Sequence, residues 1–251
     1  MKIDPIHQFN IEPLFTIGHI GNHTIAFTNS SLYMFLSVAV ISILMIGGVA
    51  GRQLVPGRFQ SMAELTYEFV ASTVRNTAGA EGMKFFPLIF SLFMFICVSN
   101  LVGIIPYTFT VASHIIVTAA LALLVFFTVL IYGFYKNGLK FFKIFVPSGI
   151  PIYILPLVVF IEIFSFFLRP ISHSVRLFAN MLAGHISLKV FAGFVAMLGT
   201  SLGAIGWVGG VMPLALTVAL TALELLVAFL QAYVFAILTC IYLNDAIHPG
   251  H

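Results

Sequence analysis

The chain has 251 residues, of which 61% are hydrophobic and only 8% are charged, with a formal net charge of +3. A globular domain carries about 25% charged residues, so this composition excludes a water-exposed surface over most of the chain and indicates an integral membrane protein. The alternating short strands of an outer-membrane barrel are nearly absent from the sequence, so we expect an all-α bundle. The few cations fall mostly in short loops and indicate orientation, and no nucleic-acid partner is expected.

The first long apolar run, residues 32–51, is followed at once by Arg52 and Arg58. About 20 apolar residues form roughly 30 Å of helix, which is enough to cross a bilayer. Cations beside a span favour the cytoplasmic side, so the N-terminus is expected outside. The preceding residues show no signal-peptide pattern, and we expect this span to be retained.

Residues 58–76 have apolar side chains at helical spacing on one side and charged residues opposite. The apolar side consists of Phe59, Met62, Leu65, Phe69, Val70 and Val74, and the charged side of Glu64, Glu68 and Arg75. This pattern is typical of an interfacial helix. An aqueous-side helix packed on the other spans fits equally, because amphipathicity does not distinguish lipid from protein as the apolar partner.

Residues 85–106 and 113–135 are two further runs of spanning length. Lysines precede the first run and follow the second, whereas the loop between them has no lysine or arginine. The positive-inside rule therefore places that loop outside. The last two elements, residues 150–199 and 213–243, complete five crossings of a single membrane domain, with the C-terminus inside.

These last two elements are longer than simple crossings require. A helix from Pro156 to Gly199 would be about 66 Å long, roughly twice the hydrocarbon thickness. Either the segment contains a break, for which Pro170 and Gly184 are candidates, or the helix is strongly tilted. Hydropathy does not distinguish these alternatives.

Polar and ionisable side chains share one side of each long element, because successive helical residues turn by about 100°. The first arc contains Glu162, Ser165, Arg169, His173, Arg176, Asn180, Gly184 and Ser187. The second arc contains Thr217, Thr221, Glu224, Ala228 and Gln231. Such faces meet water, or each other, at lower cost than they meet lipid.

Arg176 is the most informative residue of the first arc. A guanidinium stays protonated in a protein, and holding it at bilayer depth costs about 2.5 to 3.5 kcal/mol on insertion scales. Adhesion between helices does not require that cost, so Arg176 indicates function. The hydroxyls of both arcs more often bond to their own backbone or to a neighbouring helix.

His185 and Glu224 form a second candidate site. An imidazole titrates near neutral pH, and a carboxyl in a low-dielectric site titrates closer to that range, so the two groups could exchange protons through a hydrated cleft. Both residues lie in the outer half of the membrane in this topology. An isolated intramembrane histidine is more often a hydrogen-bonded packing residue, which is the alternative.

The polar residues lie in the segments Arg176-Leu-Phe-Ala-Asn180-Met-Leu-Ala-Gly184-His185 and Glu224-Leu-Leu-Val-Ala-Phe-Leu-Gln231. Together with Asn100-Leu-Val-Gly-Ile-Ile-Pro106, they closely resemble the a subunits of F-type ATP synthases. The resemblance covers essentially the whole chain. It implies that the two long final elements form a steeply tilted helical hairpin.

The resemblance also implies a stator that faces a rotating ring of c subunits, each with a carboxyl at mid-membrane, between two offset aqueous half-channels. Arg176 would be the essential cation of this stator. Asn180 and Gln231 would be its polar neighbours at the ring-facing surface. A fixed positive charge would attract each arriving carboxylate and bar direct proton hopping between the half-channels.

For the half-channels themselves, the resemblance implies that His185 and Glu224 line the outer one. Glu162 and His173 are weaker candidates for the inner one. Many bacterial members have an acid at the position of His185 and a histidine at that of Glu224. The reversed pair in this chain retains one acid and one imidazole, so a proton relay is still expected.

The partners implied are the c-subunit ring, the peripheral-stalk b subunits and the rest of the F-type ATP synthase, together with the lipid bilayer and protons. The sequence has no phosphate-binding glycine loop, so any ATP chemistry is expected in a partner, and the chain alone is not expected to be an enzyme. No catalytic residue, cofactor or metal site is expected in it. The expected location is the bacterial inner membrane, with the mitochondrial inner membrane as the alternative.

Two other functions fit polar faces inside a membrane protein. A solute transporter with a midplane anion site at Arg176 would have paired repeats with discontinuous helices, and no internal repeat is visible. A non-translocating scaffold would use the arcs only for adhesion, with Arg176 and Glu224 as a buried salt bridge. Substitution of Arg176 is expected to distinguish these functions from a stator.

Overall fold

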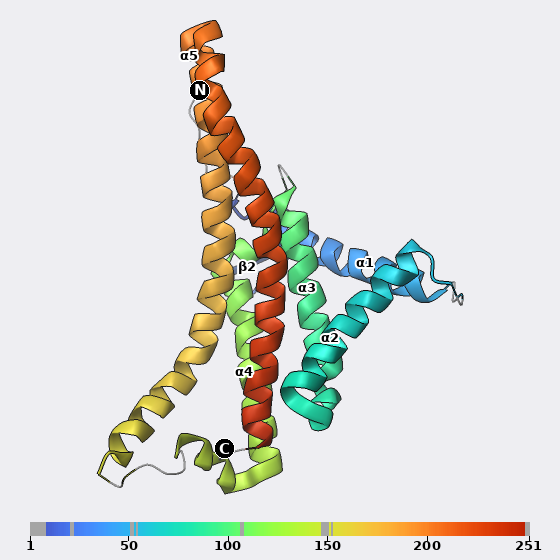
Figure 1. Ribbon diagram of the computed structural model, residues 1–251, viewed down its shortest axis with the longest axis vertical. Coiled ribbons are helices and arrows are strands. Elements are labelled where there is room, and N and C mark those ends of the chain that lie inside the picture. The colour runs from blue at the N-terminus through green and yellow to red at the C-terminus, as the bar shows by residue number, and fades with distance from the viewer. Residues whose placement is uncertain are drawn as a thin grey trace. The chain divides into compact units, whose positions relative to one another are not determined.

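The computed structural model (Figure 1) describes residues 9–20, 23–50, 53, 55–105, 108–146, 151 and 153–248. Some of the residues that bound or flank the expected spans lie outside the described residues, namely Gly51, Arg52, Pro106, Tyr107 and Ile150. The described part is predominantly helical, which confirms the all-α membrane class.

Five stretches of helix in the described part are long and apolar enough to cross a membrane, as the sequence predicted. These stretches are Asn29–Ala50, Arg58–Ile104, Ile115–Phe145, Leu155–Ser201 and Val208–Ile247. The α-helices within them are α1 (Asn29–Ala50), α2 (Arg58–Gly82), α3 (Phe86–Ile104), α4 (Ile115–Asn137) and α5 (Leu155–Ile247), and α5 contributes two of the five stretches. Short 3₁₀ segments, η2 (Met83–Phe85), η3 (Val111–Ser113) and η4 (Gly138–Phe145), lie between them.

Helix α5 contains both of the long final elements. Its backbone stays helical through Pro170 and Gly184, so the expected alternative of a break at either residue is wrong. The non-helical residue within α5 is Gly203, with φ 56° and ψ −132°, a left-handed conformation that glycine adopts without a Cβ clash. Gly203 separates a first arm, Leu155–Ser201, from a second arm, Val208–Ile247. The tilt of these arms in a membrane stays a prediction.

Contacts divide the chain into two compact units. The first unit comprises Met1–Val40, Ile96–His114 and Leu177–Gln231, and the second comprises Ile41–Phe95, Ile115–Arg176 and Ala232–His251. Helices α1, α3 and α5 each contribute to both units.

The first unit begins with an element that was not predicted, a two-stranded antiparallel sheet. Strand β1 (Pro13–Ile20) pairs with β2 (His23–Thr28), and the rings of Phe15 and Phe27 stack across it with centroids 5.0 Å apart. Beyond this sheet, the two arms of α5 lie side by side within the unit (Figure 1). Helix α3 is tied to the second arm by Asn100, which is fully buried and donates its Nδ2–H to the carbonyl of Ala228 at 3.3 Å.

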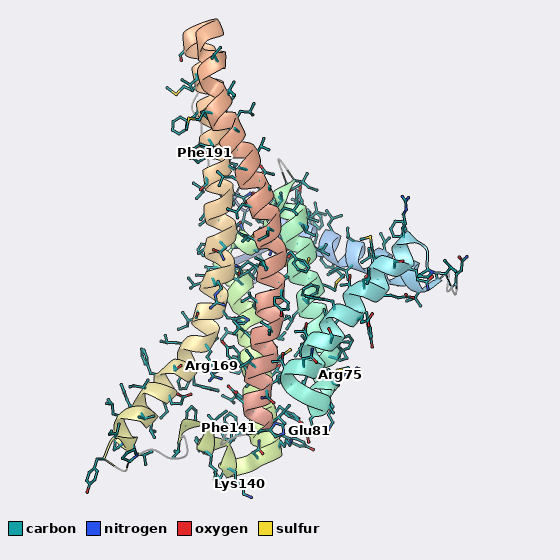
Figure 2. The ribbon with its side chains drawn as sticks, viewed as in Figure 1. Arg75, Glu81, Lys140, Phe141, Arg169 and Phe191 are labelled. Atoms are coloured by element: carbon teal, nitrogen blue, oxygen red, sulfur yellow. The ribbon has the colours of Figure 1, made fainter. Side chains whose placement is uncertain are left out.

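The second unit has an aromatic interior around Phe166 of α5. The ring of Phe166 lies 5.2 Å from that of Phe126, 6.3 Å from that of Phe141 and 5.4 Å from that of Phe145, between centroids. Gly133 in α4 leaves the space that Phe141 fills, because a Cβ there would lie 2.3 Å from that ring. Figure 2 labels Phe141 among these side chains. The close fit fixes η4 against α4.

Helix α2, also in the second unit, divides its apolar side between two environments. Val70 and Val74 are 1% and 0% exposed, so protein covers them. Phe59, Met62 and Leu65 are 66%, 54% and 67% exposed. The end of α2 is held to α4 by an ion pair between Glu81, labelled in Figure 2, and Lys136. The helix therefore packs on protein at one end and leaves apolar side chains uncovered at the other.

Candidate functional site

His185 and Glu224 face each other across the two arms of α5. The Nδ1 atom of His185 lies 3.4 Å from Oε1 of Glu224, and the side chains are 6% and 5% exposed. This distance allows an ion pair and is longer than a standard hydrogen bond. Of the predicted site residues in the first unit, these two are brought together, which supports treating them as a pair.

Gly184 makes room for the carboxylate of this pair. A Cβ at residue 184 would lie 2.7 Å from Oε1 of Glu224 and 3.3 Å from its Cδ. Those atoms are at the movable end of the Glu224 side chain, so an added methyl group would displace the carboxylate before it displaced the backbone. Glycine at position 184 of the polar arc therefore leaves the space that the carboxylate of Glu224 occupies.

Thr110 is a third polar residue at the pair, and sequence reasoning missed it. Its Oγ1 lies 3.0 Å from Nε2 of His185, and the residue is 0% exposed. Thr110 stands between α3 and η3, and 75 positions separate it from His185. Its place in a loop without lysine or arginine gave no indication of this long-range contact.

Phe9 covers the pair from a further direction. Its ring is tilted against the imidazole of His185 with centroids 6.2 Å apart, and the ammonium of Lys189 lies 5.3 Å from the centre of the Phe9 ring. Lys189 is one helical turn beyond His185 on the same arm. The imidazole is thus enclosed by Glu224, Thr110 and Phe9, with one cation nearby.

The carboxylate of Glu224 is incompletely compensated. Among the described residues, neither of its two buried oxygens has a hydrogen-bond partner. The effective cost of burying an unpaired ion is several kcal/mol, and uncompensated groups of this kind call for an explanation. Sharing a proton with His185 would reduce that cost, which gives the pair the chemistry of a proton donor and acceptor.

Arg169, in the second unit, is compensated from several sides. Its Nη1 lies 2.9 Å from Oδ2 of Asp245, and its Nη2 lies 3.8 Å from Oε1 of Glu162. The guanidinium also lies 4.8 Å from the ring centre of Tyr242. Asp245 was not among the predicted site residues. Glu162, a candidate for the inner half-channel, is placed beside a cation.

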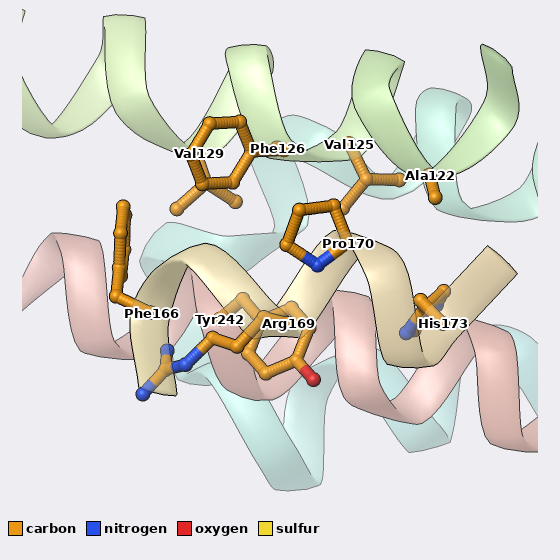
Figure 3. A pocket seen from close by; sticks show the side chains of 9 residues that line it. All are labelled: Ala122, Val125, Phe126, Val129, Phe166, Arg169, Pro170, His173 and Tyr242. Carbon is orange, nitrogen blue, oxygen red and sulfur yellow. The ribbon is translucent and has the colours of Figure 1, made fainter. Parts of the chain in front are cut away.

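His173 packs against aromatic side chains in the same unit. It is 5% exposed, and its ring lies edge-on to that of Phe235 with centroids 4.0 Å apart. Neither ring nitrogen has a hydrogen-bond partner among the described residues. The residue lines a small, mainly apolar pocket (Figure 3). The complete lining is Ala122, Val125, Phe126, Val129, Phe166, Arg169, Pro170, His173 and Tyr242.

The remaining predicted residues lie nearer the surface of their units. Arg176 and Asn180 are exposed, and Gln231 is partly exposed. Within the described part of its own unit, none of the three forms a hydrogen bond or an ion pair through its side chain. Glu224, which an adhesive function would pair with Arg176, lies against His185. The three polar residues are therefore available to a partner.

These features define an α-helical membrane protein with ionisable groups inside its apolar helices. The family described as ATP synthase A chain matches residues 31–244. Proteins named ATP synthase subunit a are 84% identical over 251 residues in Bradyrhizobium diazoefficiens, with 100% of both chains covered. Those of Rhodopseudomonas palustris strain BisA53 and Nitrobacter winogradskyi are 80% and 77% identical over 249 residues, covering 99% of this chain and 100% of theirs.

The chain therefore belongs to the ATP synthase A chain family, which confirms the resemblance seen in the sequence. The relatives are bacterial, and the apolar helices are of spanning length, so the comparison supports a bacterial membrane protein.

Proposed function

We propose that this chain is the proton-translocating stator subunit in the membrane sector of an F-type ATP synthase. The observation that carries the proposal is Arg176, an exposed guanidinium on an apolar helix with no ion pair in the described part of its own unit. The family membership supports it, because the relatives are named as a subunit of the ATP synthase. A cation without a local counter-charge fits a carboxylate supplied by another subunit.

In this proposal Arg176 acts on the carboxyls of a c-subunit ring. Its positive charge attracts each arriving carboxylate and favours loss of its proton. The same charge repels a proton that would otherwise cross directly between the two half-channels. Asn180 and Gln231 offer uncompensated polar groups beside that path. The membrane field supplies about 2.3 kcal/mol per charge per 100 mV, which the ring converts to rotation.

His185 and Glu224 form the proton-handling part of the outer half-channel. Their 3.4 Å separation is ion-pair distance, and a small approach of the two side chains would allow a proton to pass between Nδ1 and Oε1. On the inner side, Glu162 stays the candidate, with a side chain that is 33% exposed and lies near Arg169. His173 receives less support, because neither of its ring nitrogens has a hydrogen-bond partner among the described residues.

The proposed partners are the c-subunit ring, the peripheral-stalk b subunits and the other subunits of the synthase, in the bacterial inner membrane. ATP chemistry is assigned to other subunits, and this chain contributes proton transfer without being a catalyst itself. The exposed side chains Phe59, Met62 and Leu65 of α2 fit contact with lipid or with such a partner.

Substitution of Arg176 by alanine in the assembled synthase tests the proposal. ATP-driven proton pumping in inverted membrane vesicles is expected to fall to background, because the charge that discharges the ring carboxyls is lost. Arg75→Ala is the matched control, since Arg75 is an exposed arginine on α2 outside the proposed path.

Assembly of each variant is measured by the subunit composition of the purified complex. Arg75→Ala is expected to pump like the unmodified synthase. Full pumping by a correctly assembled Arg176→Ala complex would refute the stator function.

A further inference from the structure

The connection between α3 and η3 reaches the buried imidazole of His185 through Thr110. The Oγ1 of Thr110 lies 3.0 Å from Nε2 of His185 and 3.4 Å from the carbonyl oxygen of Gly103. All three groups belong to the first unit. The hydroxyl therefore bridges a helix end and the nitrogen of His185 that does not face Glu224.

The end of α3 determines what this hydroxyl can do. Carbonyls in the last turn of a helix lack an intrahelical N–H partner, and Gly103 lies one residue before the end of α3 at Ile104. Its carbonyl oxygen can only accept, and the hydroxyl oxygens of Thr108 and Thr110 each lie 3.4 Å from it. The hydroxyl of Thr108 has nearer acceptors at 2.7 Å, the carbonyl oxygens of Val102 and Ile105, so the Gly103 carbonyl is left to accept the single hydroxyl proton of Thr110. A lone pair of Oγ1 is then left for a donor on the imidazole.

Gly103 also provides the space that Thr110 occupies. A Cβ at Gly103 would lie 2.9 Å from Cγ2 and 3.2 Å from Oγ1 of Thr110. Thr110 has no exposed surface, so it cannot move outward into solvent to relieve such a contact. The glycine thus allows the threonine hydroxyl to reach both its partners.

We propose that Thr110 is a positioning residue for the His185–Glu224 pair, with a hydroxyl that accepts a hydrogen bond from Nε2–H of His185. This assignment leaves Nδ1 as the basic nitrogen that faces Oε1 of Glu224. The inference deepens the proposed function and rests on it.

With the assigned tautomer, a proton can pass from Glu224 to His185 without any other group gaining or losing a proton. A proton that leaves Oε1 of Glu224 arrives at Nδ1 of His185, so a neutral acid and a neutral imidazole become a carboxylate and an imidazolium. Nε2 keeps its proton in both states, and Thr110 accepts from it in both. Among the described residues, the charged groups near the imidazole are Glu224 of the second arm and Lys189 of its own arm.

Thr110→Val removes the hydroxyl and keeps the branched side chain, and it is tested in the assembled synthase. Loss of a hydrogen bond to an ionised group typically costs about tenfold or more, so we expect proton pumping to fall about tenfold. The imidazolium loses an acceptor for Nε2–H, so the acidic limb of the dependence of pumping on the pH of the outer side is expected to shift to lower pH.

Thr110→Ser is expected to restore at least about half of the activity, because it returns the hydroxyl.

Thr239→Val is the matched control for the loss of a buried hydroxyl. Thr239 is also 0% exposed, but its hydroxyl donates to the carbonyl of Phe235 in its own helix. Its pumping rate and pH profile are expected to match those of the unmodified synthase. If Thr110→Val shows the same rate and pH profile as Thr239→Val, the positioning role is wrong.

Nitrogen NMR of the complex with ¹⁵N-labelled histidine tests the tautomer without relying on proton flux. The His185 signals are assigned by their loss in His185→Gln. Neutral His185 is expected to carry its proton on Nε2, with both tautomers populated in Thr110→Val. A neutral His185 protonated on Nδ1 in the unmodified synthase would overturn the proposal.

The NMR and pumping results separate the two proposals. If Arg176→Ala pumps normally and the NMR shows the expected tautomer, the stator function fails and the positioning role of Thr110 stands. If Arg176→Ala abolishes pumping and Thr110→Val changes neither rate nor tautomer, only the role of Thr110 fails.

Discussion

The two units each contain an ionisable cluster on α5, and the clusters differ in charge compensation. Arg169 has Asp245 and Glu162 as counter-charges and an aromatic ring beside its guanidinium. Glu224 has an imidazole at ion-pair distance, and its oxygens lack hydrogen-bond partners among the described residues. A compensated cluster can be explained by stability alone, whereas an uncompensated buried acid indicates proton exchange.

The largest expected effect comes from removing the acid of the uncompensated cluster, Glu224. In Glu224→Gln the side chain keeps its size and loses its exchangeable acid, so proton pumping is expected to fall at least about 100-fold, the scale of general acid–base catalysis. The measurement is ATP-driven acidification of inverted vesicles, with the subunit composition as the assembly check.

Exchange of His185 and Glu224 tests whether the acid and the imidazole act together. The double variant His185→Glu with Glu224→His restores one acid and one imidazole, so it is expected to pump about tenfold faster than either single alanine variant. Equal activity in the double and single variants would argue against coupling between the two positions.

The sequence was sufficient for the helices because bilayer thickness constrains the length of an apolar span directly. It was insufficient for β1 and β2, since a two-stranded sheet is marginally stable alone and depends on the rest of the fold. Pro170 was a candidate break, yet the helix continues through it. In membrane helices, neighbouring groups and local adjustments can satisfy the carbonyl that proline leaves unpaired.

The candidate site was predictable in part, because Glu224 and Gly184 lie on the predicted polar arcs, whereas His185 lies beside them. His185 and Glu224 were identified from residue chemistry, although periodicity within each helix does not give the distance between them. Thr110 and Asp245 lay beyond sequence reasoning for a common reason. Each makes a contact across 75 or 76 positions, and periodicity within a single segment gives no indication of a contact at that separation.

A smaller effect is expected from Gly184→Ala, which displaces the carboxylate of Glu224 without removing it. This variant tests whether the position of the acid, and not only its presence, matters for proton transfer. The added Cβ would lie 2.7 Å from Oε1 of Glu224, so the carboxylate must shift away from His185. Proton pumping is expected to fall several-fold, with assembly intact, because misplacement of a reacting group by about 1 Å can cost up to 100-fold.

Gly209→Ala is the matched control in the same helix. A Cβ at Gly209 would meet no atom within 4 Å, so this variant is expected to pump at the unmodified rate. If Gly184→Ala pumps as fast as Gly209→Ala, the close approach of the carboxylate to Gly184 has no role in proton transfer.

The smallest effect on proton flux is expected at Asp245, in the compensated cluster. Asp245→Asn removes one counter-charge of Arg169 and leaves Glu162 as the other. Arg169 and Asp245 are 20% and 33% exposed, so we expect a loss of about 1 kcal/mol or less in stability, seen as a lower melting temperature of the purified complex.

Proton pumping per assembled Asp245→Asn complex is expected to stay within about twofold of the unmodified rate, since a group outside the reacting centre contributes no proton-transfer step. A double-mutant cycle with Arg169→Gln measures the coupling between the two side chains. A large loss of pumping in Asp245→Asn at unchanged stability would show that complete charge compensation does not mark a structural cluster, and the distinction between the two clusters would have to be abandoned.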